Sequence, residues 1–364
     1  MIRDLPGYRV VALSAKDSWR AALLQAAETG AKFLGLQDPP AAAEARREKD
    51  ALGLKSMQVL DGPSAAVTIA TMPEVDVVVH AIPGFDGIEP LLASLDAGKR
   101  IAFAGKEALV SAGELIGQRL ARSKGRLVPV DSEHSAVFQC LLGEDPRSVK
   151  EVVLTASGGA LRDLGLSEME KVTPEDVLRH PTWKMGKKVT VDSATLFNKA
   201  LEVIEAHFLF GIPYSNIRVV IHRQSVVHSM VTFVDGSTKA HAARPDMRLA
   251  IAYGITYPER PPRAVPSLAP YVGNLTFEEP DLDRFPCLKL GSVAGEMGGT
   301  APCVLSVADE ILVHEFLSGR IRFLDIQRTL RAVLDDYVPK EVTGLEVLVQ
   351  EKRWAERKVR ELLS

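Results

Sequence analysis

The stretch VDVVVHAIPGFDGIEPLLASLDAGKRIAFA, residues 75–104, contains two short apolar runs separated by a helical pattern. Residues 75–81 and 100–104 have the composition of buried strands, and residues 88–97 have the apolar spacing of an amphipathic helix. A strand, a helix and a second strand in this order are typical of a parallel sheet with a crossover helix. The stretch therefore predicts an α/β fold.

The same alternation continues on both sides of this stretch. We expect further strands at residues 8–13, 31–36 and 127–130, and further helices at residues 18–29, 41–52 and 108–124. Strands that alternate with helices of this length indicate a doubly wound parallel sheet. We assign this sheet to an N-terminal domain, residues 1–130.

The pattern changes after residue 152. Residues 217–234 resemble a longer strand, and the Asp235-Gly236 turn then leads to a strand at residues 239–243, which predicts an antiparallel hairpin. Several prolines near residue 265 mark a linker, and the remaining sequence is helical in pattern. We predict an α+β domain with a mainly antiparallel sheet at residues 131–257, a linker at 258–280 and a helical domain at 281–364.

Composition excludes several classes of function. The net charge of −3 and the lack of a basic patch with interleaved aromatics argue against a nucleic-acid partner. The apolar runs are too short to span a membrane, and Met1 is not followed by a signal-peptide core. Cys140, Cys287 and Cys303 have neither disulfide nor zinc spacing, so we expect reduced thiols in a cytoplasmic protein.

Two carboxylates follow the predicted strand at residues 127–130, in the run PVDSEH at 129–134. Residues two apart on an extended segment point the same way, so Asp131 and Glu133 can converge. Two converging carboxylates at the carboxyl end of a parallel strand suit a hard cation such as Mg²⁺ or Mn²⁺. A plainer interpretation is a polar helix start, with Asp131 or Ser132 as N-cap.

A second polar group occurs in the run VDSATLFNKALE, residues 191–202. We expect Asp192 or Ser193 to cap a helix that ends at Phe210, with Gly211 after it. The helical spacing places Asn198, Glu202 and Glu205 on one face, with Lys199 beside it. A hydroxyl, an amide and an amine near a helix start can hold a phosphate, while Glu202 reaches a metal. The alternative is a solvated helix face.

Three further motifs are weak when taken singly. The TASGG turn at residues 155–159 lets the backbone approach a ligand, but such turns are common. The HPTWKMG loop at 180–186 is either a lid that excludes water or a turn with a packed tryptophan. Lys106 follows the strand at 100–104. Its side chain either contacts a phosphate or a polarised carbonyl, or is an ordinary surface residue.

Together and in this order, these motifs resemble the 1-deoxy-D-xylulose 5-phosphate reductoisomerase family. The resemblance spans nearly the whole chain. It continues through QSVVHSM at 224–230, PDMR at 245–248, TYPER at 256–260, PCLKL at 286–290 and GGTAP at 298–302.

The resemblance implies a two-step reaction. A metal-chelated ketose phosphate rearranges to a branched aldehyde, which NADPH reduces to 2-C-methyl-D-erythritol 4-phosphate. It also implies a homodimer, one Mg²⁺ or Mn²⁺, and a small sugar phosphate as the only partner besides the cofactor.

The resemblance assigns roles to matching residues. The metal ligands would be Asp131, Glu133 and Glu202. The phosphate would be held by Ser157, Ser193, Asn198 and Lys199, with help from His180. Ser132 and Lys106 would contact the rest of the substrate, and Trp183 with Met185 would belong to a closing flap. The catalytic residues would be Lys106, Glu133 and His180. The residues that contact the cofactor would be Lys16, Gly105, Glu107 and Gly186.

One departure concerns the cofactor region. The family opens with a strand and a Gly-rich turn, which bring the backbone to the cofactor pyrophosphate. Residues 1–13 contain no such turn, and the loss of a central strand would split the sheet. Either Met1 is an internal methionine of a longer chain, or this is a paralogue that binds metal and sugar phosphate without turnover. A metal-dependent isomerase without redox chemistry is a third interpretation, and for the chain as written we expect weak NADPH binding.

Three smaller departures are confined to single positions or short runs. Gly105 stands where the family has asparagine, and Arg223 stands where it has proline. The run SVADE at 306–310 replaces an Asn-Ala-Ala-Asn-Glu pattern, so that Asp309 occupies an asparagine position.

Overall fold

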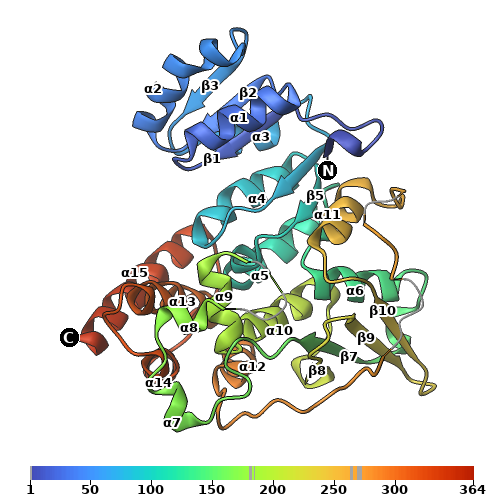
Figure 1. Ribbon diagram of the computed structural model, residues 1–364, viewed down its shortest axis with the longest axis vertical. Helices are drawn as coiled ribbons and strands as arrows, with labels where there is room; N and C mark the ends of the chain where they lie inside the picture. Colours follow the sequence, from blue (N-terminus) through green and yellow to red (C-terminus); the bar gives the residue numbers. More distant parts are fainter. Residues whose placement is uncertain (1, 180–182, 184, 263–264, 269–272) are drawn as a thin grey trace.

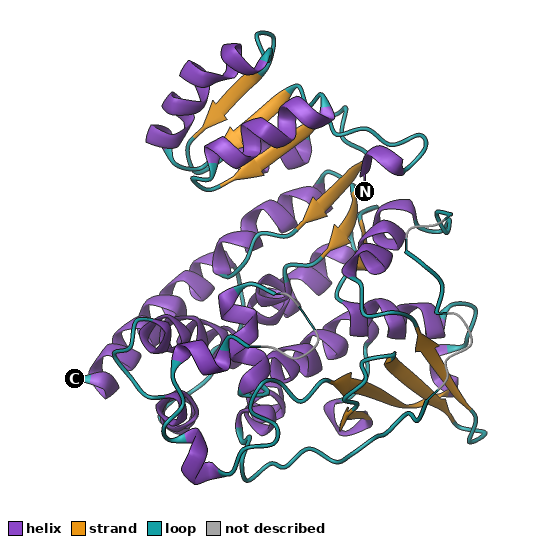
Figure 2. Cartoon of the chain, in the orientation of Figure 1, coloured by secondary structure: helices purple, strands orange, loops and turns teal. Residues whose placement is uncertain are grey.

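Two separate three-stranded parallel sheets form the N-terminal part of the chain (Figures 1 and 2). The computed structural model describes residues 2–179, 183, 185–262, 265–268 and 273–364. One sheet has the order β1-β2-β3 and the other the order β4-β5-β6. In chain order the strands are β1 (Ala12–Ala15), β2 (Phe33–Leu36), β3 (Gln58–Asp61), β4 (Val77–His80), β5 (Arg100–Phe103) and β6 (Arg126–Pro129).

Helices alternate with these strands, which confirms the predicted α/β class. They are α1 (Trp19–Thr29), α2 (Pro39–Glu48), α3 (Ala65–Thr71), α4 (Ile88–Asp96) and α5 (Lys106–Leu120). The predicted split of the sheet is also observed, because no strand pair joins the two sheets among the described residues. The two units meet instead where α3 packs on α4.

Some predicted boundaries in this part are wrong. The strand expected at 8–13 begins only at Ala12. The helix expected at 41–52 begins at Pro39, because the Asp38 side chain accepts the Ala41 N–H at 3.1 Å, and it continues as a 3-10 turn. The unit β3–α3 was not predicted, since β3 is short and both of its ends are exposed polar residues.

The second sheet region is mainly antiparallel, as predicted, with the order β10-β9-β7-β8 (Figure 1). Only β7 and β8 run parallel. The strands are β7 (Val149–Ala156), β8 (Ile217–Ile221), β9 (Val227–Phe233) and β10 (Thr238–Ala242), and the β9–β10 hairpin turns at the expected Asp235-Gly236 pair.

The long strand expected at residues 217–234 is wrong, because it is two strands on either side of β7. The His222 ring interrupts it: Nε2 accepts the N–H groups of Val226 and Val227 at 3.2 and 3.1 Å, and Ser225 adopts a φ of +50°. The chain therefore turns back there, and β9 pairs antiparallel with β7.

The remaining helices, apart from α11, contribute to one continuous core. They are α6 (Ser132–Leu141), α7 (Leu166–Met169), α8 (Pro174–Val177), α9 (Lys187–Ala194), α10 (Phe197–Phe210), α11 (Met247–Thr256), α12 (Cys287–Met297), α13 (Ala301–Leu317), α14 (Phe323–Asp335) and α15 (Leu345–Leu363). The last four make the predicted helical region (Figure 1). Among the residues that the structure describes, no helix combines the length and apolar character needed to cross a membrane.

Helix α10 is the central element of this core. It packs against α5, α9 and α12, and most of its residues between Phe197 and Ala206 are buried. At Gly291 of α12, an added Cβ would lie 2.5 Å from the Ala200 carbonyl oxygen, which is rigid backbone. The absence of a side chain at Gly291 therefore sets the distance between α10 and the C-terminal helices.

We expect Gly291→Ala to destabilise the protein, because the new methyl group meets rigid backbone rather than a movable side chain. Overpacking of this kind costs about 1–3 kcal/mol. Gly117→Ala is the matched control, since Gly117 is also helical and a Cβ added there would have nothing within 4 Å. That variant should gain up to about 1 kcal/mol from helix propensity. Thermal unfolding of both variants tests this, and equal midpoints would contradict it.

Candidate active site

A cavity of about 310 Å³ lies where α5, α6, α9 and α10 approach the end of β7. Most of the predicted site residues line it: Lys106, Asp131, Ser132, Glu133, Ser157, Trp183, Met185, Ser193, Asn198, Lys199 and Glu202. Segments far apart in the sequence thus contribute to one space. His180 lies outside the described residues.

Asp131 and Glu133 both line the cavity, but the backbone that carries them differs from the expected extended segment. Helix α6 begins at Ser132, so the two residues do not share an extended segment. Asp131 occupies the N-cap position but makes no capping hydrogen bond, and its carboxylate instead pairs with Lys106. Carboxylate oxygens of Asp131, Glu133 and Glu202 nevertheless lie within 4.8 Å of one another.

The helix expected from Asp192 to Phe210 is also different at its start. It is two helices, α9 and α10, because Leu196 adopts a φ of +58° and the Thr195 hydroxyl accepts the Phe197 N–H at 3.2 Å. Asp192 therefore lies in the last turn of α9 and is no N-cap. The break leaves Asn198 and Lys199 in the first turn of α10, whose end at Gly211 is as predicted.

Two lysines lie between the three carboxylates. The Lys106 ammonium is 2.9 Å from Asn198 Oδ1 and 3.3 Å from Glu202 Oε1, and it also pairs with Asp131. The Lys199 ammonium is 2.9 Å from Glu133 Oε1 and pairs with Glu202 as well. Three acids face two bases, so the group keeps an excess of negative charge.

Burial and the excess of negative charge both raise the pKa of Glu202. Burial raises the pKa of Glu202 to about 7, and repulsion from Glu133 adds to the effect, although Lys199 opposes it. Burial also acts on Asp131, but the Lys106 ammonium outweighs it and holds the pKa of Asp131 well below its usual range. Hard oxygen donors with uncompensated negative charge suit a divalent cation, so these residues fit a Mg²⁺ or Mn²⁺ ion.

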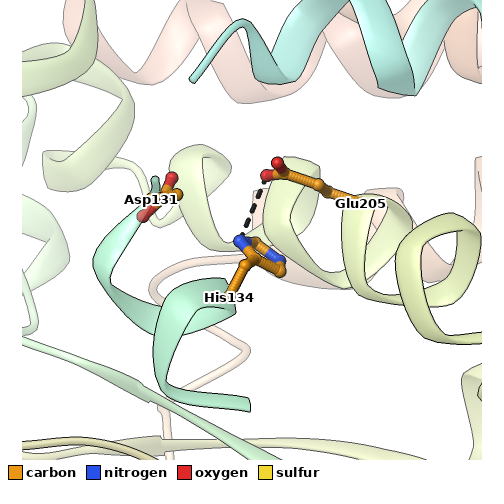
Figure 3. A group of neighbouring side chains, drawn as sticks. All are labelled: Asp131, His134 and Glu205. Atoms are coloured by element: carbon orange, nitrogen blue, oxygen red, sulfur yellow. Dashed lines mark ion pairs between the residues drawn. The ribbon is translucent and has the colours of Figure 1, made fainter. Parts of the chain in front are cut away.

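His134 and Glu205 form a buried pair next to the carboxylates. Neither residue was assigned a role from the sequence. His134 and Glu205 are fully buried, and His134 Nδ1 lies 3.2 Å from Glu205 Oε2 (Figure 3). The other ring nitrogen bonds the Glu202 carbonyl at 2.9 Å. One imidazole therefore fixes α6 to α10, and with it the spacing of Glu133 and Glu202. The helical spacing that grouped Glu205 with Glu202 was the available signal.

Another part of the cavity wall is formed by two backbones in close contact. Gly158 and Gly159 have φ angles of +87° and +73°, and an added Cβ at Gly159 would overlap the Ser193 carbonyl group. The turn after β7 and the end of α9 therefore touch, which brings Ser157 and Ser193 to the same cavity.

Ser225 and His228 also line the cavity, but their sequence motif served only for the family resemblance. His228 follows the break at His222, and its ring centroid lies 6.3 Å from that of Trp183. Burial lowers the pKa of His228, although the Glu133 carboxylate opposes this. The break in the predicted strand, which brings His228 to the cavity, depends on a side-chain contact that no local pattern reveals.

The four residues expected at the cofactor do not line this cavity. Lys16 follows β1 and lies 3.7 Å from Asp86. Gly105 precedes α5, where a Cβ would lie 2.6 Å from His80 Nδ1, so an asparagine would require this ring to shift. Glu107 lies 3.7 Å from Lys188, and Gly186 precedes α9.

Family models match the chain in three segments. The model described as 1-deoxy-D-xylulose 5-phosphate reductoisomerase matches residues 1–113. The model of the C-terminal domain of this reductoisomerase matches residues 127–210, and that of the DXP reductoisomerase C-terminal domain matches residues 242–358.

Relatives and solved structures agree with these models. The 1-deoxy-D-xylulose 5-phosphate reductoisomerase of Pelotomaculum thermopropionicum is 45% identical, over 98% of this chain and 92% of the relative, and that of Thermomicrobium roseum is 48% identical over 87% and 83%. A crystal structure of DOX-P reductoisomerase with NADPH, fosmidomycin and magnesium superposes with a TM-score of 0.93 at 37% identity, covering 99% of this chain and 94% of the other. The Zymomonas mobilis enzyme with NADPH has a TM-score of 0.89 at 37% identity, covering 100% and 93%. The chain belongs to the 1-deoxy-D-xylulose 5-phosphate reductoisomerase family.

Proposed function

We propose that this chain converts 1-deoxy-D-xylulose 5-phosphate to 2-C-methyl-D-erythritol 4-phosphate, with NADPH and one Mg²⁺ or Mn²⁺. The observation that carries the proposal is the cavity, where oxygens of three carboxylates lie within 4.8 Å of one another and which is also lined by the hydroxyl, amide and ammonium groups that we assign to the phosphate. The paralogue without turnover is disfavoured, because the chain is 45% identical to a reductoisomerase in an alignment that covers 98% of this chain.

Asp131, Glu133 and Glu202 would hold the divalent cation. A cation held by these residues would supply Lewis-acid chemistry to the substrate. Lys106 stays cationic, because the carboxylates of Asp131 and Glu202 outweigh burial and raise its pKa well above the usual value. It therefore donates hydrogen bonds to a substrate oxygen, and Ser132 adds a hydroxyl beside Glu133.

The phosphate end would be formed by Ser157, Ser193, Asn198 and Lys199. Burial acts against the charge of Lys199, but Glu133 and Glu202 raise its pKa, so the ammonium is retained. Asn198 and Lys199 lie in the first turn of α10, where the helix dipole also favours an anion. We assign His180 to the same end and to the chemistry, and Trp183 with Met185 to a cover that excludes water.

NADPH would bind beside this cavity through Lys16, Gly105, Glu107 and Gly186. Lys16 follows β1 and Gly105 follows β5, and the carboxyl ends of parallel strands are where such sheets hold ligands. In this proposal residues 1–130 bind the cofactor, residues 131–257 bind metal and substrate, and residues 281–364 form the helical domain after a linker at 258–280.

We also propose a cytoplasmic homodimer. The three cysteines are free and buried, which suits a reducing compartment.

The reaction itself is tested by following NADPH oxidation with 1-deoxy-D-xylulose 5-phosphate and Mn²⁺. We expect oxidation that requires both, with 2-C-methyl-D-erythritol 4-phosphate as the product by mass spectrometry. Rearranged aldehyde without NADPH oxidation would favour the isomerase without redox chemistry instead.

Replacing Glu202 by Gln should weaken Mn²⁺ binding by about tenfold or more, because a neutral amide replaces an anionic ligand. Isothermal titration of the metal alone measures the change. Glu48→Gln, an exposed carboxylate outside the site, is the matched control and should bind Mn²⁺ like the wild type. Unchanged affinity in a folded E202Q protein would refute the metal assignment.

Lys199→Ala should cost about 1.5–3 kcal/mol of binding for phosphate-bearing ligands, because a charge-assisted hydrogen bond is lost. The dephosphorylated sugar should lose little. Lys171→Ala changes an exposed lysine and serves as control. Equal losses for the two ligands would show that Lys199 does not bind the phosphate.

A further inference from the structure

A second charge cluster lies outside the cavity, and of its residues the proposed function gives a role only to Glu107. The Lys188 ammonium lies 2.6 Å from Asp192 Oδ2, 2.8 Å from Asp309 Oδ2 and 3.7 Å from Glu107 Oε1. We call these four residues the Lys188 cluster. They come from α9, α13 and α5, so one ammonium joins the N-terminal part, the catalytic region and the C-terminal helices.

The cluster holds more negative than positive charge. The side chains of Asp192 and Asp309 are 1% and 0% exposed, and one ammonium faces three carboxyl groups. Asp192 Oδ1 and both carboxylate oxygens of Asp309 are buried without a hydrogen-bond partner among the residues described. Two buried carboxylates on one ammonium would leave these oxygens unsatisfied and repelling each other. A single proton between them removes both penalties.

We propose that Asp192 and Asp309 share one proton beside Lys188, and that this bond fixes the end of α9 and thereby Ser193 at the phosphate end of the cavity. Asp309 is thus a positioning residue. The role of Ser193 in this proposal rests on the proposed function. The proton shared by Asp192 and Asp309 is independent of that function.

The surroundings of the pair favour the protonated form. Burial raises the pKa of Asp192 well above its usual range, and the Asp309 charge adds to this while Lys188 opposes it. Burial likewise raises the pKa of Asp309 against the effect of Lys188. The other groups facing the pair are Glu107 of α5, the buried Cys287 thiol of α12 and, next along α13, Glu310, none of which supplies a second cation.

The position of Asp192 makes the bond relevant to the cavity. Ser193 follows it directly, and the helix breaks two residues later at Thr195 and Leu196. The Ser193 carbonyl also touches Gly159, so a shift of this turn displaces both hydroxyls of the phosphate end.

Asp309→Asn is the main variant, since the amide keeps a donor but cannot ionise, and Asp309→Ala removes the donor as well. The infrared difference spectrum of wild type minus D309N, taken on the protein alone at neutral pH, should contain the C=O band of a protonated carboxyl that shifts in ²H₂O. Absence of that band would overturn the shared proton.

Thermal unfolding against pH provides an independent measurement. Acids whose pKa is raised on folding bind more protons in the folded than in the unfolded chain, so the contribution of this pair to wild-type stability falls as pH rises above about 4. D309N lacks this loss, and its midpoint should rise relative to wild type between about pH 5 and pH 8. A difference that does not change with pH would overturn the proposal.

Kinetics then test the positioning role. The KM of the wild type for 1-deoxy-D-xylulose 5-phosphate should rise with pH by up to about tenfold per unit, the limit for one proton. D309N should show a smaller rise, and D309A a raised KM throughout, with kcat little changed. Identical pH profiles for wild type and D309N would refute positioning. If no variant turned over, the proposed function would fail, while the infrared and thermal results would still decide the shared proton.

Discussion

The burial of the Glu202 carboxylate between two ammonium groups is the interaction on which the rest of the site depends. Lys106 comes from α5 and Lys199 from α10, and both meet the acids that follow β6. A charge placed this deep is tolerable only while its partners stay in place, since an unpaired buried ion is very costly. The parallel sheets, helix α10 and the helix packing behind it can therefore be understood as the support that keeps these five side chains together.

That support is mechanical as well as electrostatic. His134 hydrogen-bonds the backbone carbonyl of Glu202 and lies 3.2 Å from the Glu205 carboxylate, so that α6 and α10 cannot slide past each other without breaking a buried polar contact. On its other side α10 lies directly on α12 at Gly291. The C-terminal helices thus contribute to a site that they do not line, and the Lys188 cluster connects them to it a second time.

The sequence predicted the architecture well wherever local pattern decides structure. The alternation of apolar runs and helical spacing was sufficient for the parallel α/β class, except for the β3–α3 unit, and the spacing of Asn198 and Glu202 was sufficient for their shared face. The separation of the two sheets was expected from the departure from the family pattern and not from the alternation. Prediction from the sequence failed where one side chain redirects the backbone. The positive φ of Leu196 and the hydrogen bonds of His222 each break an element that has no break in its hydrophobic pattern. Helical spacing grouped Glu205 with Glu202, but the contact of Glu205 with His134 joins distant segments, and spacing along one helix does not reveal the partner.

The contact between Gly159 and Ser193 restricts how this protein can vary. Every other amino acid carries a Cβ, and at position 159 that atom would both force a left-handed backbone on an L-residue and overlap a carbonyl group. A larger residue at position 159 would meet the backbone of Ser193, and a second substitution cannot make backbone smaller. Neither segment of this contact can therefore change alone. Substitution in this enzyme is therefore free to reshape the walls of the phosphate end, but the two segments that form it must change together or remain as they are.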